Sequence, residues 1–193
     1  MGSTMVEMRD ADPPRPSLAL VAGIAVHDAV RSFMGNRHSE LALKWPNDLL
    51  AGRAKIAGIL LEAAQVATVV GVGVNLVSAP KVPGRSTTAL AALGVEVSRD
   101  VFARSLASSF ATEVARWRAD GLPATIARWL ALSFAPGTPM TVGEAGTGRP
   151  RAGHFAGLTG EGALRLRLVN GDERVIHAGE VDLIKECADA AGG

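Results

Sequence analysis

The segment LALKWPNDLLAGRAKIAGILLEAA, residues 41–64, places polar and charged residues inside aliphatic runs that alternate in the manner of β-strands. The chain contains four lysines against sixteen arginines, and two of the four, Lys44 and Lys55, lie in this segment. Side chains alternate along a strand, so a strand that buries Trp45 turns Lys44 to the opposite face. The segment therefore predicts strands that bury one face and present Lys44 away from the main core.

Runs of apolar residues broken by turn residues predict three adjacent, antiparallel strands. They cover 41–45, 55–63 and 67–75, with Pro46-Asn47-Asp48 as a turn after the first, and a short strand around 3–8 precedes them. Helical spacing of apolar residues predicts a helix capped by Ser17, a second capped by Ser98, and a short third from Pro123 to about Phe134. The pattern indicates an α+β fold.

The residue pattern changes after Gly137, where short runs of β-forming residues alternate with glycine-rich turns. The runs cover 140–142, 153–158, 163–169 and 174–176, and Asn170-Gly171 is a typical two-residue hairpin turn. This spacing predicts a small, five-stranded, barrel-like domain.

The amino-acid composition limits the classes of protein to which this chain can belong. With 193 residues, of which 48% are hydrophobic, the chain is long enough to bury a core. A formal net charge of +1 without runs of like charge argues against binding to nucleic acid or to a membrane surface. The single cysteine, Cys187, excludes an internal disulfide framework. No signal peptide is evident and the apolar stretches are short or interrupted, so we expect a cytoplasmic protein.

Polar residues and glycines gather on the predicted strands. Gly58 follows Lys55, and a glycine within a strand lets a ligand approach the backbone closely. Gly71, Gly73 and Asn75 share one face of the third strand. The two glycines leave this face without side chains, and the Asn75 amide lies at its end. Ammonium groups bind carboxylate and phosphate oxygens, so the set suits activation of a carboxylate by a nucleotide.

Each of these features also has a purely structural explanation. A lysine at the end of a strand commonly protects a solvated edge. Pro46-Asn47-Asp48 is a common turn, because Asn and Asp hydrogen-bond to their own backbone. Gly71 and Gly73 also permit close packing of a helix. From the residues alone, ligand binding and a structural role both stay open.

Three motifs resemble those of the biotin–protein ligases. KWPND at 44–48, KIAGIL at 55–60 and GVGVN at 71–75 follow the order and approximate spacing of that family's motifs. Similarity extends from about residue 3 to 185, and it implies a catalytic domain of the class II aminoacyl-tRNA-synthetase-like fold followed by an SH3-like barrel. We expect a partial catalytic domain over 1–135, an SH3-like domain over 136–186 and a disordered tail over 187–193.

The resemblance implies a reaction and a set of roles. The family condenses biotin with ATP and Mg²⁺ to biotinyl-5′-AMP, and then transfers the biotinyl group to a lysine of a biotin carboxyl carrier domain of a carboxylase. Carried over by position, Lys55 is the catalytic residue and contacts the biotin carboxylate. The other implied roles are Gly58, Ile59 and Leu60 for biotin, Lys44 and Asn47 for the phosphates, Asn75 for adenine, and Asp48 for a metal ion.

The sequence departs from the family pattern at its beginning. The family carries a Ser-Asn-Thr-type strand and a loop rich in Gly and Arg upstream of the strand at 3–8, and neither is found here. Gly2-Ser3-Thr4 is followed by Met5 where the motif needs Asn, so we treat this match as chance. Each lost charged hydrogen bond costs about 1.5–3 kcal/mol, so we expect weak or undetectable ligation by this chain alone.

Two alternative functions stay open. A lipoate-type ligase or transferase shares the fold and an active-site lysine, although the Trp-Pro-Asn-Asp that follows Lys44 argues against it. The alternative outside the enzymes is a non-catalytic remnant or subunit that binds an acceptor domain. An exposed strand edge would favour self-association, so a homodimer is also expected as a possible state.

Overall fold

The computed structural model describes residues 1–35, 41–144 and 150–184. Its first sheet has five strands in the order β1-β5-β4-β3-β2, and all neighbours are antiparallel. The strands are β1 Gly2–Glu7, β2 Leu41–Lys44, β3 Asp48–Ala51, β4 Ala54–Ala63 and β5 Ala67–Val74. The four strands predicted from the apolar runs in this half of the chain are therefore confirmed, with small shifts at their ends.

The fifth strand, β3, was missed by the sequence analysis, which read Asp48 as part of a turn. Asp48 begins β3, every residue of which is buried, and the turn is confined to residues 45–47. Gly52 has a φ of 56°, which lets the chain pass from β3 into β4 within two residues. The runs predicted as neighbours, β2 and β4, are therefore separated by β3.

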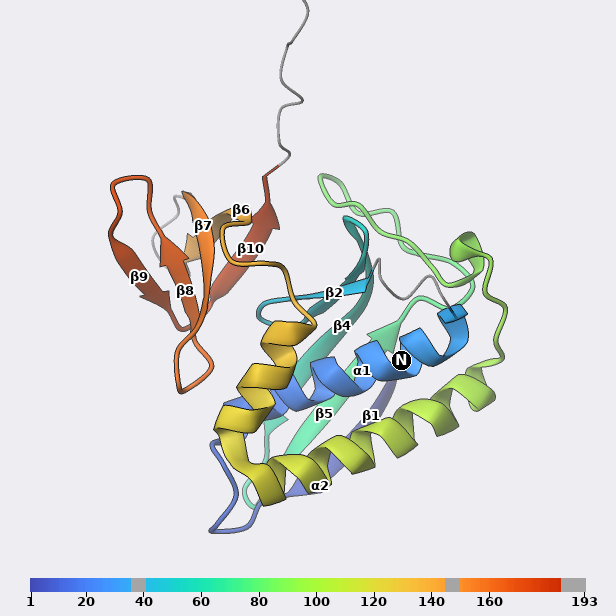
Figure 1. Ribbon diagram of the computed structural model, residues 1–193. Helices are drawn as coiled ribbons and strands as arrows, with labels where there is room; N and C mark the ends of the chain where they lie inside the picture. The colour runs from blue at the N-terminus through green and yellow to red at the C-terminus, as the bar shows by residue number, and fades with distance from the viewer. Residues whose placement is uncertain (36–40, 145–149, 185–193) are drawn as a thin grey trace, which may run out of the picture.

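Two helices cover one face of the first sheet, as Figure 1 shows. They are α1, Leu18–Met34, and α2, Arg99–Ala131. The Trp117 indole N–H on α2 donates to Ser17 Oγ at 2.8 Å, and Phe33 packs against Phe102 with 5.8 Å between the ring centroids. Among the described residues, no helix covers the opposite face of the sheet.

Of the two predicted helix caps, Ser98 is confirmed and Ser17 is wrong. Ser98 caps α2 as expected, because its Oγ accepts a hydrogen bond from the Val101 N–H at 3.4 Å. Ser17 precedes α1 as expected but does not cap it; its own backbone is helical and its Oγ donates to Pro14 O at 2.6 Å. The predicted third helix is the second half of α2, which breaks at Gly121 with a φ of 77° and ends at Ala131.

The segment Arg15–Met34 is long and apolar enough to pass a length-and-composition test for crossing a membrane. The expectation that every apolar stretch is too short or too interrupted to cross a membrane is therefore wrong for this segment. In the structure 72% of the most apolar window is buried, against the sheet and α2. Its apolar character is explained by this burial in the core of the fold.

The second sheet contains five strands, the number expected after Gly137, in the order β10-β6-β7-β8-β9. They are β6 Pro139–Glu144, β7 Pro150–Leu158, β8 Leu164–Arg167, β9 Glu173–Ile176 and β10 Gly179–Leu183. The Leu168 N–H donates to Asp172 O across the predicted Asn170-Gly171 turn. Four of these strands correspond to the predicted runs, whereas β10 was not predicted. The hairpin forms, but its loop spans residues 169–171 and not two residues. Among the described residues β9 and β10 do not pair, so the expected barrel is not closed.

The two sheets meet near β2. The Trp45 indole N–H donates to Gly162 O of the second sheet at 3.1 Å, and Gly162 lies against Leu20 of α1. The boundary expected between residues 135 and 136 falls between the end of α2 and the start of β6. The tail expected at 187–193 lies outside the described residues.

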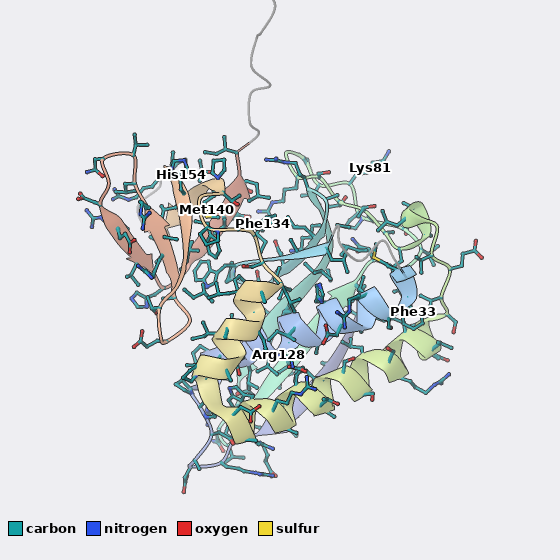
Figure 2. The ribbon with its side chains drawn as sticks, in the orientation of Figure 1. Phe33, Lys81, Arg128, Phe134, Met140 and His154 are labelled. Carbon is teal, nitrogen blue, oxygen red and sulfur yellow. The ribbon has the colours of Figure 1, made fainter. Side chains whose placement is uncertain are left out.

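A cluster of charged side chains joins α1 to α2. His27, which is 3% exposed, donates from Nδ1 to Asp28 Oδ1 at 3.1 Å, and Asp28 Oδ2 lies 3.5 Å from the Arg128 guanidinium (Figure 2). Arg128 also contacts the buried Glu113 at 3.1 Å. The hydrogen bond from His27 holds the pKa of Asp28 below its ordinary value of 3.8, with Arg31 and Arg128 acting in the same direction and burial opposing them.

This cluster predicts a pH-dependent stability. A lowered carboxyl pKa stabilises the fold at pH values above 3.8, and the stabilisation is lost as the pH falls through the folded-state pKa. We expect Asp28→Asn to lower the free energy of unfolding by roughly 1–2 kcal/mol at pH 7, and by much less at pH 3. Urea unfolding at the two pH values measures this, with the exposed Asp10→Asn as the control. An equal loss at both pH values would contradict the prediction.

Candidate active site

Lys55 reaches the open face of the sheet because β4 is irregular. Lys55 and Gly58 are three residues apart, so in a regular strand their side chains would lie on opposite faces. A bulge opposite Leu49–Leu50 of β3 leaves Ile56 as an extra residue on β4 and changes this alternation. As a result the Lys55 ammonium lies 3.0 Å from where a Cβ on Gly58 would be. Gly58 therefore makes room for the end of the Lys55 side chain.

The backbone of Lys55 is held by the loop that follows β5. The Lys55 N–H donates to Ser86 O at 2.9 Å, and Lys55 O accepts from the Thr88 N–H at 3.0 Å. This short parallel bridge continues the sheet beyond the bulge. Lys55 is thus fixed on both sides of its backbone, while its side chain is 34% exposed.

Asp48 links the two lysines of the opening segment. It pairs with Gly58 across β3 and β4, so its side chain lies on the same face. Its Oδ2 is 3.1 Å from Lys44 Nζ and its Oδ1 contacts Lys55 Nζ, although the carboxylate is only 9% exposed. Two ammonium groups on one carboxylate leave a net charge of about +1, and Lys55 is the more exposed of the two.

A pocket of about 630 Å³ lies on the open face beside Lys55. The lining includes Ser3 of β1, Lys55, Gly58, Ile59 and Leu60 of β4, and Gly71 and Gly73 of β5. The Ile59 side chain is 4% exposed and belongs to the helix side, so this residue offers its backbone. Leu60 is 60% exposed, and with the glycines it forms a flat apolar surface. The structure thus brings together Lys55 and the residues expected to line the biotin site.

Lys44 points away from this pocket. Its Nζ donates to Val181 O of β10 at 2.6 Å, besides its contact with Asp48. The side chain is 14% exposed, and Lys44 is not among the residues that line the pocket. Lys44 and Lys55 therefore share Asp48, but only Lys55 faces the pocket.

The two asparagines hold backbone segments together. Asn47 Nδ2 donates to Ile59 O at 2.7 Å, and the Ile59 N–H returns a bond to Asn47 O at 2.9 Å. Asn75 Nδ2 donates to Thr88 O at 2.9 Å, which ties the end of β5 to the loop that holds Lys55. Neither amide is in the lining of the pocket beside Lys55. The roles expected of them toward phosphate and adenine therefore stay proposals.

The arrangement around Asp48 does not fit a direct magnesium ligand. Both of its oxygens already contact ammonium groups, which would repel a divalent cation at the same place. Within residues 1–35, 41–144 and 150–184, no group of three or more His, Cys, Asp or Glu side chains is placed to hold a metal ion. We therefore assign no metal ligand among the residues that the structure describes.

Sequence reasoning missed two parts of the site. Ser3, set aside as a chance match, reaches the pocket because β1 pairs with β5 and places Ser3 opposite Gly71. The ion pair between Arg85 and Glu180 joins the loop after β5 to β10. The alternation of the strand at 3–8 was a usable signal for Ser3, whereas no local pattern connects Arg85 with Glu180.

The antiparallel sheet, with helices on one face and the pocket beside Lys55 on the other, has the fold of the biotin and lipoate ligase class. The chain matches the model of the Biotin/lipoate A/B protein ligase family over residues 4–77. Its fold is similar to that of the biotin protein ligase from Aquifex aeolicus in complex with biotin and ATP, with a TM-score of 0.76 at 20% identity. That match covers 95% of this chain and 77% of the other.

Similarity to two relatives establishes the family of this chain. The biotin–[acetyl-CoA-carboxylase] ligase of Paracoccus denitrificans is 36% identical over 179 residues, covering 85% of this chain and 71% of the relative. The ligase of the same name from Mycobacterium tuberculosis is 36% identical over 165 residues, covering 85% of this chain. The chain belongs to the biotin–protein ligase family, as its motifs indicated. It spans 61% of the length of the M. tuberculosis relative.

Proposed function

We propose that this chain is a biotin–protein ligase that converts biotin and ATP to biotinyl-5′-AMP and transfers the biotinyl group to a lysine of a biotin carboxyl carrier domain. Family membership supports the proposal. The observation that carries it is the placement of the Lys55 ammonium over Gly58, inside the pocket on the open face of the sheet. The lining also includes the exposed Met1 and Glu62, and Lys55 lies beside the apolar strip of Leu60, Gly71 and Gly73. An ammonium group beside such a strip suits a ligand with a carboxylate and an apolar body.

Lys55 is the proposed catalytic residue. In the first step a carboxylate oxygen of biotin attacks the α-phosphorus of ATP, and pyrophosphate leaves. Two anions must approach each other in this step, so an ammonium group beside them lowers the barrier, by about 3 kcal/mol for one well-placed donor. In the second step the acceptor amine attacks the acyl carbon, AMP leaves, and the amine loses a proton. Lys55 stabilises negative charge on the oxygens in both steps.

The proposed biotin subsite rests on residues of the pocket, whereas the proposed nucleotide subsite rests on the family motifs. Leu60, Gly58 and Gly71 offer the ring system of biotin a flat, partly apolar surface beside Lys55. Asn75 and Asn47 are proposed for adenine and phosphate by position in the family motifs alone. Magnesium is proposed to arrive with the phosphates of ATP, because Asp48 does not fit the metal.

The rest of the proposed function follows the family. The five-stranded second sheet is proposed as the SH3-like domain over 136–186, and residues 1–135 as the catalytic domain. The partner is the carrier domain of a biotin-dependent carboxylase, in the cytoplasm. The net charge of +1 gives no support to nucleic-acid binding.

Calorimetric titration of the chain with biotin and, separately, with lipoate tests this proposal. We expect biotin to bind in the micromolar range, which corresponds to a binding free energy of about 8 kcal/mol. Lipoate is expected to bind much more weakly. Binding of lipoate in preference to biotin would support the lipoate-type alternative, and binding of neither would support a non-catalytic remnant.

A further inference from the structure

Lys44 joins the two sheets through a buried side chain. It belongs to β2 of the first sheet, and its ammonium donates to Val181 O of β10 in the second sheet at 2.6 Å. The same ammonium lies 3.1 Å from Asp48 Oδ2. These contacts use two of its three hydrogens, and the side chain is only 14% exposed. Lys44 is therefore held between the sheets and directed away from the pocket.

Asp48 carries the effect of Lys44 to Lys55. Each oxygen of the Asp48 carboxylate contacts one of the two ammonium groups, so the lysines compete for one negative charge. While Lys44 shares that charge, the Lys55 ammonium retains net positive charge toward the pocket. Without Lys44, the carboxylate would be left to Lys55 alone and would neutralise it. Lys44 thus affects both the position of Lys55 and the charge that a ligand would meet.

A second contact from the same strand reaches the backbone of Lys55. Glu180, the neighbour of Val181 on β10, forms an ion pair with Arg85 in the loop after β5. The next residue in that loop, Ser86, accepts the Lys55 N–H at 2.9 Å. Two consecutive residues of β10 therefore connect to the side chain and to the backbone of Lys55. The Glu180–Arg85 pair is about half exposed, so it is the weaker of the two connections.

We propose that Lys44 is a positioning residue, held by β10, that orients Asp48 and keeps the Lys55 ammonium available to the ligand carboxylate. It is not a direct ligand of the nucleotide phosphates, the role that its place in the family motif suggested. The second sheet then contributes to the pocket through its backbone, although none of its residues line the pocket beside Lys55. The identity of the carboxylate rests on the proposed function, whereas the link from β10 to Lys55 rests on the contacts alone.

Lysine side-chain NMR tests the link without any assay of ligation. The chain has four lysines, so protein labelled with ¹³C at lysine Cε gives four signals, which Lys→Met variants assign. In the wild type we expect Lys55 Cε to be far more ordered than Cε of Lys81, an exposed residue (Figure 2). Lys44→Met is expected to shift the Lys55 Cε signal, because the Asp48 carboxylate then pairs with Lys55 alone. The matched change Lys81→Met should leave Lys55 unchanged.

Kinetics of biotinyl-5′-AMP formation supply a second readout. Lys44→Met should lower kcat by about tenfold to a hundredfold through misplacement of Lys55, with the KM for ATP within about twofold of the wild type. A raised KM for ATP with unchanged kcat would show contact with the phosphates and overturn the proposal. An unmoved Lys55 Cε signal in Lys44→Met would also overturn it, whether or not the chain makes the adenylate. If Lys44→Met fails to fold, Lys44→Gln, which also lacks the charge, gives the same two readouts.

Discussion

Replacing Lys55 with methionine is expected to abolish the weak formation of biotinyl-5′-AMP expected of this chain and to lower its affinity for biotin by about tenfold to a hundredfold. The affinity loss follows from one charged hydrogen bond of about 1.5–3 kcal/mol between the ammonium and the biotin carboxylate. The loss of rate is larger, because the same ammonium also stabilises charge that develops as the two anions meet. Mass spectrometry of the adenylate and calorimetry with biotin measure the two effects separately.

The matched control is Lys81→Met, which removes an exposed lysine outside the pocket and should leave both measurements unchanged. Adenylate formation by Lys55→Met at the wild-type rate would contradict the role that we assign to this residue.

Gly58→Ala has the second-largest expected effect. A Cβ at this position would lie 3.0 Å from Lys55 Nζ, 3.1 Å from Lys55 Cε and 3.7 Å from Asp48 Oδ1. The end of the lysine side chain must move to accommodate it, and a shift of about 1 Å at a reacting group costs up to a hundredfold in rate. We expect biotin affinity to fall by about tenfold, because the added methyl group also occupies the ligand surface. The backbone at Gly58 suits alanine, so the fold should persist.

Gly143→Ala is the control for this change. Gly143 lies in β6 of the second sheet, where an added Cβ makes an ordinary contact of 3.8 Å and is remote from the pocket lining. It should leave biotin binding unchanged. Undiminished biotin affinity in Gly58→Ala, measured by the same calorimetric titration, would show that Lys55 and its ligand do not meet above this glycine.

The sequence predicted the elements whose apolar residues repeat at a clear period. α1 was evident because its buried residues follow helical spacing over 17 residues, and the strands of the second sheet because turns separate them regularly. β3 was missed because its four residues are all buried, so the run lacks the alternation that marks a half-exposed strand. Ser17 failed as a cap because its hydroxyl is engaged by Pro14 and Trp117, a tertiary contact.

The candidate site was predictable in its members but not in its geometry. The motifs identified Lys55, Gly58 and Leu60, and these do line one pocket. The bulge that turns Lys55 toward Gly58 depends on the pairing of β4 with β3, which the residue pattern does not reveal. Likewise, the contact of Lys44 with Val181 spans 137 positions and depends on how the two sheets pack.

The most direct test of the account compares biotin with its uncharged alcohol analogue on the wild type and on Lys55→Met, by calorimetry. If the ammonium of Lys55 pairs with the biotin carboxylate, the wild type should prefer biotin by about tenfold or more. In Lys55→Met that preference should disappear, which gives a coupling energy between the two charges of about 1.5 kcal/mol or more. An equal preference for biotin in both proteins would contradict the central claim, because it would place the carboxylate away from Lys55.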